Sequence, residues 1–203
     1  MVVTKIEEYT QGKSKIYLND SFAFVLYKGE LRQLKLKEGE ELIDATYERI
    51  MNDILDKRAK MRAMHLLEKQ DRTEKGLRQK LKENLYPEEI IDSAVEYVKH
   101  YHYIDDGRYA ENFIAYRKST MSRNEMKNKL MQKGISADII ESKIEEAYRD
   151  DEGAEYELIK SLMLKKYGNI AAMSHDERNK MLAFFYRKGF PVRLVEEVIR
   201  DCS

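Results

Sequence analysis

Three stretches of the sequence follow one pattern: LRQKLKENLYPEEIIDSAV at residues 77–95, MKNKLMQKGISADIIESKI at 126–144 and MLAFFYRKGFPVRLVEEVI at 181–199. In each stretch, two apolar residues stand four positions apart, and a break follows four positions after the second. A hydrophobic residue, a residue typical of a helix start and another apolar pair complete the pattern. Apolar residues at this spacing share one face of an α-helix, so each stretch predicts two amphipathic helices joined by a tight turn.

The residues at the break favour a helix–turn–helix junction. Gly134 and Gly189 suit the left-handed position that follows the last turn of a helix. Pro87 and Pro191 fit the first position of a helix, where no backbone N–H is needed. The first repeat has Leu85 at the corresponding break.

A further amphipathic segment precedes each stretch, at about residues 59–70, 107–118 and 154–167, so the repeating unit has three helices. SRNE at 122–125 and SHDE at 174–177 are capping-box patterns that predict helix starts.

The first forty residues have a different period. Three segments alternate in hydrophobicity or are rich in β-branched and aromatic residues: VVTKIEEY, SKIYL and SFAFVLY. Three others are typical of turns: TQGK, ND and KGE. They predict a small antiparallel sheet of three or four strands that ends before KEGEE at 37–41. So small a sheet is marginal alone, so we expect it to pack on the next helix, which begins near Asp44.

The predicted fold class is therefore mainly α: three tandem three-helix repeats that form a curved, elongated body, with a small N-terminal antiparallel β-sheet. The predicted boundaries are a β-rich extension over residues 1–43 and helical repeats over 44–104, 105–150 and 151–203.

Composition narrows the class of protein. Lys+Arg and Asp+Glu are equal at 37 each, so the total charge does not indicate a nucleic-acid binder. The single cysteine, Cys202, excludes an internal disulfide framework and a multi-cysteine zinc site. No apolar run approaches the roughly 18–20 residues that span a bilayer, and the N-terminus lacks the apolar region of a signal peptide. We therefore expect a cytoplasmic protein with no membrane partner.

The charge is unevenly distributed. Residues 57–82 hold ten bases and three acids, 117–133 hold six and one, and 178–193 hold five and none. Stacked repeats would extend such a positive surface, which could meet an acidic protein patch or DNA phosphates; the alternative is a solvated face without a partner. The predicted partner-binding residues are Lys75, Arg78, Arg117, Lys118, Arg123, Lys127, Lys129, Lys133, Arg187 and Lys188.

The stretch EYVKHYHYIDDGRYAENF at 96–113 contains residue types found in hydrolytic metal sites. His100 and His102 point about 200° apart on a helix, however, and no HExxH motif is present, so we expect no metal and no catalytic residue. A structural role at the junction between repeats is favoured. Asp105 is a good helix N-cap, Arg108 could pair with Asp105 or Asp106, and Tyr109 would be core with Tyr103, Ile104, Ala110 and Phe113.

Aromatic residues gather near the end of the chain. Phe184, Phe185, Tyr186 and Phe190 either form the core of the last repeat or an exposed adhesive surface. Their spacing repeats that of Leu81 and Leu130, which favours the core.

With these motifs in order, the chain resembles the RecX regulatory proteins of bacterial recombination over roughly residues 58–203. YIDDGRYAENFIAYR at 103–117 resembles the family's hallmark, followed by SRNEMKNKLMQKGI and by FFYRKGF near the end. Gly76 and the Tyr86–Pro87 pair depart from the usual pattern of the first repeat.

The resemblance implies a non-enzymatic modulator of the RecA recombinase in DNA repair, homologous recombination and the SOS response. It implies binding to RecA and to the RecA–DNA filament and, most often, inhibition of ATP hydrolysis, strand exchange and co-protease activity. No cofactor is expected, and the chain is expected to be a monomer. Two alternatives stay open: a repeat protein that binds the DNA backbone directly, with weak affinity for single- or double-stranded DNA, and a helical scaffold for other proteins.

Overall fold

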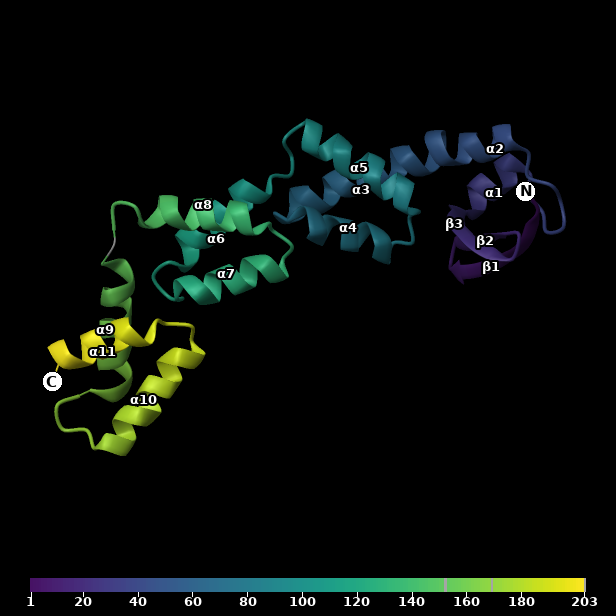
Figure 1. Cartoon of the computed structure of the whole chain (residues 1–203). Helices are drawn as coiled ribbons and strands as arrows, with labels where there is room; N and C mark the ends of the chain where they lie inside the picture. The colour runs from purple at the N-terminus through teal and green to yellow at the C-terminus, as the bar shows by residue number, and fades with distance from the viewer. Residues whose placement is uncertain (152, 169, 203) are drawn as a thin grey trace. The chain divides into compact units, whose positions relative to one another are not determined.

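The computed structural model describes residues 1–151, 153–168 and 170–202 and is mainly helical, with a small sheet near the N-terminus (Figure 1). The chain forms two compact units, Met1–Asp105 and Asp106–Ser203. The first unit holds the sheet and the first three-helix repeat, and the second unit holds the other two repeats.

The sheet has the strands β1 (Val3–Thr10), β2 (Lys13–Leu18) and β3 (Ser21–Tyr27), antiparallel in the order β1-β2-β3. Alternation along β2 buries Ser14, Ile16 and Leu18. Along β3 the buried run is Phe24, Val25 and Leu26, whereas Phe22 is exposed because a register shift between Ile16 and Tyr17 interrupts the pairing. The predicted antiparallel sheet is confirmed, with three strands.

A helix, not the predicted turn, follows β3. The helix α1 spans Lys28–Leu34 and contains the KGE segment. The Glu30 carboxylate accepts a hydrogen bond from the Tyr27 N–H at 2.7 Å, which stabilises the first turn. The interpretation of KGE as a turn was wrong because this local capping contact lets a short segment that contains Gly29 become helical.

A long helical run begins where it was predicted, with α2 (Asp44–Arg49), the π-helical turn η1 (Ile50–Leu55) and α3 (Asp56–Lys69). Buried residues recur at intervals of four: Met51, Leu55, Ala59 and Ala63. An ideal α-helix has 3.6 residues per turn, so such a row drifts around the axis. The wider π turn offsets part of this drift and keeps the row on the core.

One core joins the sheet to the helices of the first unit. It contains Ile16, Phe24 and Leu26 from the sheet together with residues of η1, α3, α4 (Glu74–Glu83) and α5 (Glu88–His100). The expectation that the sheet packs on the following helix is confirmed.

The Arg58 side chain links α3 to the sheet. Its guanidinium donates to the Val25 carbonyl at 2.6 Å and to the Glu30 carboxylate at 3.1 Å, and it lies 4.8 Å from the centre of the Tyr27 ring. The Arg58 and Glu30 side chains are only 21% and 22% exposed, so solvent weakens this pair less than it weakens surface pairs.

We expect Arg58→Met to lower the free energy of unfolding of the first unit by about 2 kcal/mol, because it leaves a half-buried carboxylate unpaired. Urea unfolding followed by circular dichroism measures this effect. Lys57→Met is the control, because Lys57 pairs with Asp53 at 3.4 Å on the exposed side of the same helix and should change stability by less than about 0.5 kcal/mol. Equal losses in the two variants would contradict the assigned role of Arg58.

The second unit repeats the three-helix arrangement twice. The helices α6 (Asp106–Arg117), α7 (Arg123–Gln132) and α8 (Ala137–Tyr148) surround a core that includes Ile114, Met126 and Leu130. The helices α9 (Ala154–Tyr167), α10 (His175–Arg187) and α11 (Val192–Asp201) surround another, which includes Met181 and Phe185. The prediction of three three-helix repeats is confirmed.

The turns at the three breaks share one geometry. Leu85, Gly134 and Gly189 all have positive φ, at 62°, 90° and 80°. The next N–H donates back to a carbonyl five residues earlier in each repeat, as from Phe190 to Phe185 at 3.1 Å. This is the Schellman ending that the glycines predicted. Pro87 and Pro191 stand at the N-cap, and the helices begin one residue later at Glu88 and Val192, so the prediction that the prolines occupy the first helical position was wrong by one residue.

Candidate functional site

The second helix of each repeat carries most of the predicted basic surface and begins at a capped N-terminus. The side chains of Thr73, Ser122 and Ser174 accept the N–H of the residue three positions on, at 3.1, 3.1 and 3.4 Å. At Ser174 the predicted capping box is complete. A Cβ at residue 76 would stand 3.2 Å from the Thr73 hydroxyl. This close approach favours glycine at this position, although glycine departs from the usual pattern of the first repeat.

Residues at the N-terminus of α7 form hydrogen bonds with residues of the third repeat. The Ser122 hydroxyl, which is fully buried, donates to the Lys188 carbonyl at 2.6 Å, and the Asn124 amide donates to the Gly189 carbonyl at 3.0 Å. The Arg123 N–H donates to Glu155 at 2.9 Å. The end of α10 and the start of α9 are thus fixed to the start of α7, which joins the second repeat to the third.

Arg123 and Lys118 lie against Tyr148 and already have partners within the unit. The Arg123 guanidinium stands 3.9 Å from the centre of the Tyr148 ring and pairs with Glu155 at 3.4 Å. Lys118 lies 4.7 Å from the same ring, pairs with Asp151 at 2.8 Å and donates to the Ala147 carbonyl. Burial, followed by the nearby Glu155 carboxylate, raises the pKa of Tyr148 to about 12. These two cations contribute to internal packing.

Arg78 is similarly engaged in the first unit. It bonds Glu74 at 2.9 Å and Asp92 across the turn to α5. Burial alone would raise the pKa of Glu74, but hydrogen bonds from Arg78 and Lys99 outweigh it and lower that pKa below its ordinary value. Lys75 lies exposed on the same helix.

The remaining predicted cations of the second repeat have looser contacts. Lys127 is 3.5 Å from Glu141, and Lys129 is 3.5 Å from Glu125. Lys133 lies over the Tyr109 ring and Arg117 over the Tyr116 ring, at 5.4 and 4.9 Å. Partly exposed ion pairs contribute little to stability, so Lys127 and Lys129 can exchange partners at small cost.

The end of α10 presents two exposed cations. Arg187 and Lys188 are exposed and have no ion pair within the described part of the chain. Tyr186, beside them, is 68% exposed, while Phe185 and Phe190 are buried. The predicted aromatic core is thus correct for Phe185 and Phe190 and wrong for Tyr186.

Sequence reasoning missed Tyr186 as a surface residue, although the repeat contains a signal for it. Tyr186 follows the buried Phe185 as Met131 follows the buried Leu130, and Met131 is 48% exposed. One step along a helix turns a side chain by about 100°, which carries it away from the core.

The stretch at 96–113 spans the boundary between the units. The helix α6 begins at Asp106, which places Asp105 at the predicted capping position. Ile104 and Ala110 are buried, whereas Tyr103 is 47% exposed, so the prediction of a core role for Tyr103 was wrong. Tyr109 packs on the core of the second repeat. Pairing of Arg108 with Asp105 or Asp106 stays a prediction.

The two histidines of this stretch differ in their surroundings and backbone. His100 and Tyr101 stack edge to face at 5.0 Å, and His102 has a left-handed backbone with φ 55°. Among the residues that the structure describes, no group of three or more His, Cys, Asp or Glu side chains could hold a metal ion.

These features define a class: a helical-repeat protein in which three similar three-helix units follow a small sheet. Models of the first, second and third three-helix domains of RecX match residues 59–97, 105–143 and 154–199 in that order. The chain belongs to the RecX family of regulatory proteins.

Relatives of similar length support this assignment. The regulatory protein RecX of Clostridium acetobutylicum is 29% identical over 98% of this chain and 95% of its own. That of Caldanaerobacter subterraneus is 30% identical over 98% of each chain. A crystal structure of regulatory protein RecX matches with a TM-score of 0.67 and 26% identity over 97% of this chain and 98% of its own. RecX from Lactobacillus salivarius has the same fold, with a TM-score of 0.65 and 22% identity over 73% of this chain and 96% of its own.

Within the described residues, no helix combines the length and the apolar character needed to cross a bilayer.

Proposed function

We propose that this chain is a non-enzymatic, monomeric regulator that binds the RecA recombinase and the RecA–DNA filament in the cytoplasm. It inhibits RecA's ATP hydrolysis, strand exchange and co-protease activity. The ordered match of all three RecX domains carries this proposal. This chain resembles regulatory proteins named RecX over 98% of its length, so the regulatory role that their name states is the best-supported role for it.

The distribution of partners among the ten predicted cations suggests where a filament binds. Arg187 and Lys188 are exposed beside Tyr186, and tyrosine and arginine are effective at protein contacts. Lys127 and Lys129 add two weakly paired cations on α7. Arg78, Lys118 and Arg123 already have close intramolecular partners, so they are poor candidates for the contact.

Purified protein added to RecA–DNA filaments should lower ATP hydrolysis and strand exchange. Arg187→Glu/Lys188→Glu should weaken filament binding by at least about tenfold, because it places like charges against an acidic partner surface. Filament sedimentation and the ATPase rate measure the effect.

Lys165→Glu/Lys180→Glu is the matched control, because it makes the same charge change at two other exposed lysines of the third repeat. Full inhibition by the Arg187/Lys188 variant would exclude this end of α10 as the contact. No effect of the unaltered protein on filaments, together with no binding to them, would exclude the proposed function itself.

Direct binding to the DNA backbone is the second candidate function, and the exposed Arg187 and Lys188 favour it. It predicts affinity for single-stranded DNA in the absence of RecA, falling steeply with salt on a log–log plot. The proposed RecA regulator does not require such affinity, so the two functions separate in this measurement.

A further inference from the structure

The outer face of the N-terminal sheet carries lysine and aromatic side chains next to one another. Ser14, Ile16 and Leu18 of β2 are buried, so the alternate residues of this strand point away from the core. Residues that pair directly across an antiparallel sheet share a face, and the register extends the outer face to both neighbouring strands. The outer face consists of Lys5, Glu7 and Tyr9 on β1, Lys13, Lys15 and Tyr17 on β2, and Phe22, Val25 and Tyr27 on β3.

The charge of this outer face is positive. Lys5 pairs with Glu7 at 2.6 Å, and Glu7 also accepts a hydrogen bond from the Tyr17 hydroxyl at 3.3 Å. Lys13 and Lys15 have no ion pair among the residues that the structure describes. They occupy alternate positions of one strand, roughly 7 Å apart along it. Two ammonium groups without an acidic partner, placed in a row, complement a chain of regularly spaced negative charges.

Two rings of the outer face are available for stacking. Tyr9 is 45% exposed and Phe22 is 41% exposed. Lys15 lies 4.6 Å from the centre of the Tyr9 ring, and the Phe22 ring meets Tyr17 edge to face at 6.0 Å. A cation–π contact at an exposed site contributes less than the stacking of a nucleic-acid base on an aromatic ring. A base can therefore replace the Lys15 ammonium over Tyr9, and the released ammonium can bind a phosphate.

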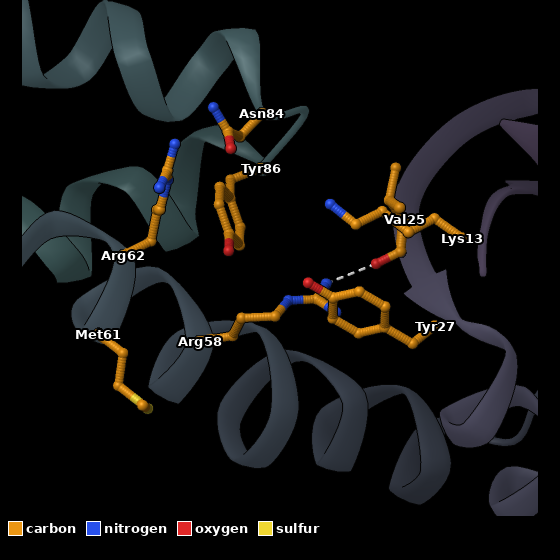
Figure 2. Close-up of a pocket in the computed structure, with 8 residues that line it drawn as sticks. All are labelled: Lys13, Val25, Tyr27, Arg58, Met61, Arg62, Asn84 and Tyr86. Atoms are coloured by element: carbon orange, nitrogen blue, oxygen red, sulfur yellow. Dashed lines mark hydrogen bonds between the residues drawn. The ribbon is translucent and has the colours of Figure 1, made fainter. Parts of the chain in front are cut away.

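The Tyr27 ring is already engaged. Lys13 and Arg58 lie 5.2 and 4.8 Å from its centre. Figure 2 shows the Arg58 guanidinium beside this ring, where the outer face borders a polar pocket of about 390 Å³. Arg58 also pairs with Glu30, which fixes it against the sheet. Tyr27 thus bounds the outer face at β3, and the rings left for stacking are those of Tyr9 and Phe22.

Lysines and open rings on one face match single-stranded DNA. The bases of a single strand offer flat faces to the rings, and its phosphates pair with the lysines. A duplex stacks its bases against one another and leaves the rings without partners, and an acidic peptide supplies carboxylates to the lysines alone. Glu7 already accepts hydrogen bonds from Lys5 and Tyr17, so its carboxylate offers no free acceptor to a ribose 2′-hydroxyl, which favours DNA over RNA.

We propose that the outer face of the sheet binds single-stranded DNA by stacking bases on Tyr9 and Phe22 and by pairing phosphates with Lys13 and Lys15. The site takes about two or three successive nucleotides of any sequence, because every base has a face that can stack on a ring. It shares no residue with the ten predicted partner-binding cations, so it goes beyond both the RecA contact and backbone binding by the helices.

The test is fluorescence anisotropy of a labelled oligothymidylate with the full chain in the absence of RecA. We expect saturable binding at low salt. An abasic strand of the same length keeps every phosphate and lacks the bases, so it should bind at least about tenfold more weakly. The proposal is wrong if no binding occurs, or if the abasic strand binds equally well. It is also wrong if a duplex or an oligouridylate binds more tightly, or if a hexaglutamate peptide displaces the DNA more effectively than unlabelled oligothymidylate does.

Two variants separate the rings from the charges. Tyr9→Ala/Phe22→Ala should weaken binding of the oligothymidylate at least about tenfold and leave the log–log salt slope unchanged, because it removes no charge. Lys13→Gln/Lys15→Gln should also weaken binding and should make that slope shallower by about 0.7 for each phosphate no longer neutralised.

Tyr101→Ala/Tyr103→Ala is the control for the ring variant. It removes two exposed rings of the same unit that belong to no strand of the sheet, and it should leave affinity and slope unchanged. Unaltered affinity of a ring variant that circular dichroism shows to be folded overturns the proposal, as does unaltered affinity and slope of the lysine variant. If Arg187→Glu/Lys188→Glu abolishes binding instead, the DNA lies on the helices and the proposal is wrong. Because RecA is absent, these outcomes are independent of the proposed regulatory function.

Discussion

Gly189→Ala is expected to lower the free energy of unfolding of the second unit by about 3 kcal/mol. The backbone at Gly189 has φ +80°, where an L-residue loses about 1–2 kcal/mol. A Cβ built there would also stand 2.8 Å from the Ser122 hydroxyl and 3.2 Å from the Glu125 backbone nitrogen. Displacing Ser122 removes the cap of α7, a loss of about 1 kcal/mol, and its bond to the Lys188 carbonyl.

Gly39→Ala separates backbone strain from contact. Gly39 has the same φ of +80°, but no described atom beyond its chain neighbours lies within 4 Å of the position that its Cβ would take. Gly39→Ala should lose only the free energy that the left-handed backbone costs an L-residue, about 1–2 kcal/mol. Urea unfolding gives both free energies, and amide hydrogen exchange should show faster opening of α7 in Gly189→Ala alone. Equal losses, with α7 protected in both, would mean that the close approach at Ser122 contributes nothing.

Glu155→Ala is expected to cost the second unit about 3 kcal/mol, because it breaks a buried ion pair and leaves Arg123 uncompensated. Glu155 is 5% exposed, accepts the Arg123 N–H at 2.9 Å and pairs with the Arg123 side chain. The Arg123 guanidinium would keep its contact with the Tyr148 ring, 3.9 Å away, without a carboxylate beside it.

Glu157→Ala is the matched control for this loss. Glu157 lies in the same first turn of α9 but is exposed, so it shares the interaction with the helix dipole and lacks the buried pair. We expect a change of less than about 0.5 kcal/mol, measured by the same unfolding experiment. Glu155→Gln should fall between the two, since its amide oxygen can still accept the Arg123 N–H. A Glu155→Ala variant as stable as Glu157→Ala would refute the role given to Glu155.

Local patterns predicted much of the fold. The breaks at Gly134 and Gly189 gave the position of the left-handed turns, and the same alignment placed Leu85 at a turn although leucine rarely adopts positive φ. Hydrophobic spacing placed the helices because burial of one face requires it. The helix α1 was missed because it depends on one contact between Glu30 and the Tyr27 backbone.

The candidate site was less predictable, because a charge in the sequence does not reveal its partner in space. Arg123 and Lys127 look alike in a basic segment, yet Arg123 meets Glu155 from another repeat, 32 positions away. Arg62 stands in the sequence as one base among ten in its segment. The residues that line one pocket with it come from β2, β3 and the turn between α4 and α5, and they come together only in the folded unit.

The number of residues in the π turn Ile50–Leu55 sets the rotation of the sheet and α1 about the axis of α3. Each residue of an α-helix adds about 100° of rotation about its axis. Deleting one residue here and restoring α-helical winding would turn the sheet and α1 about the axis of α3. Val25 and Tyr27 would then leave the side of α3 that carries Arg58. The contacts of Arg58 with the sheet thus exist at one chain length, so a single-residue deletion would be more damaging here than most substitutions.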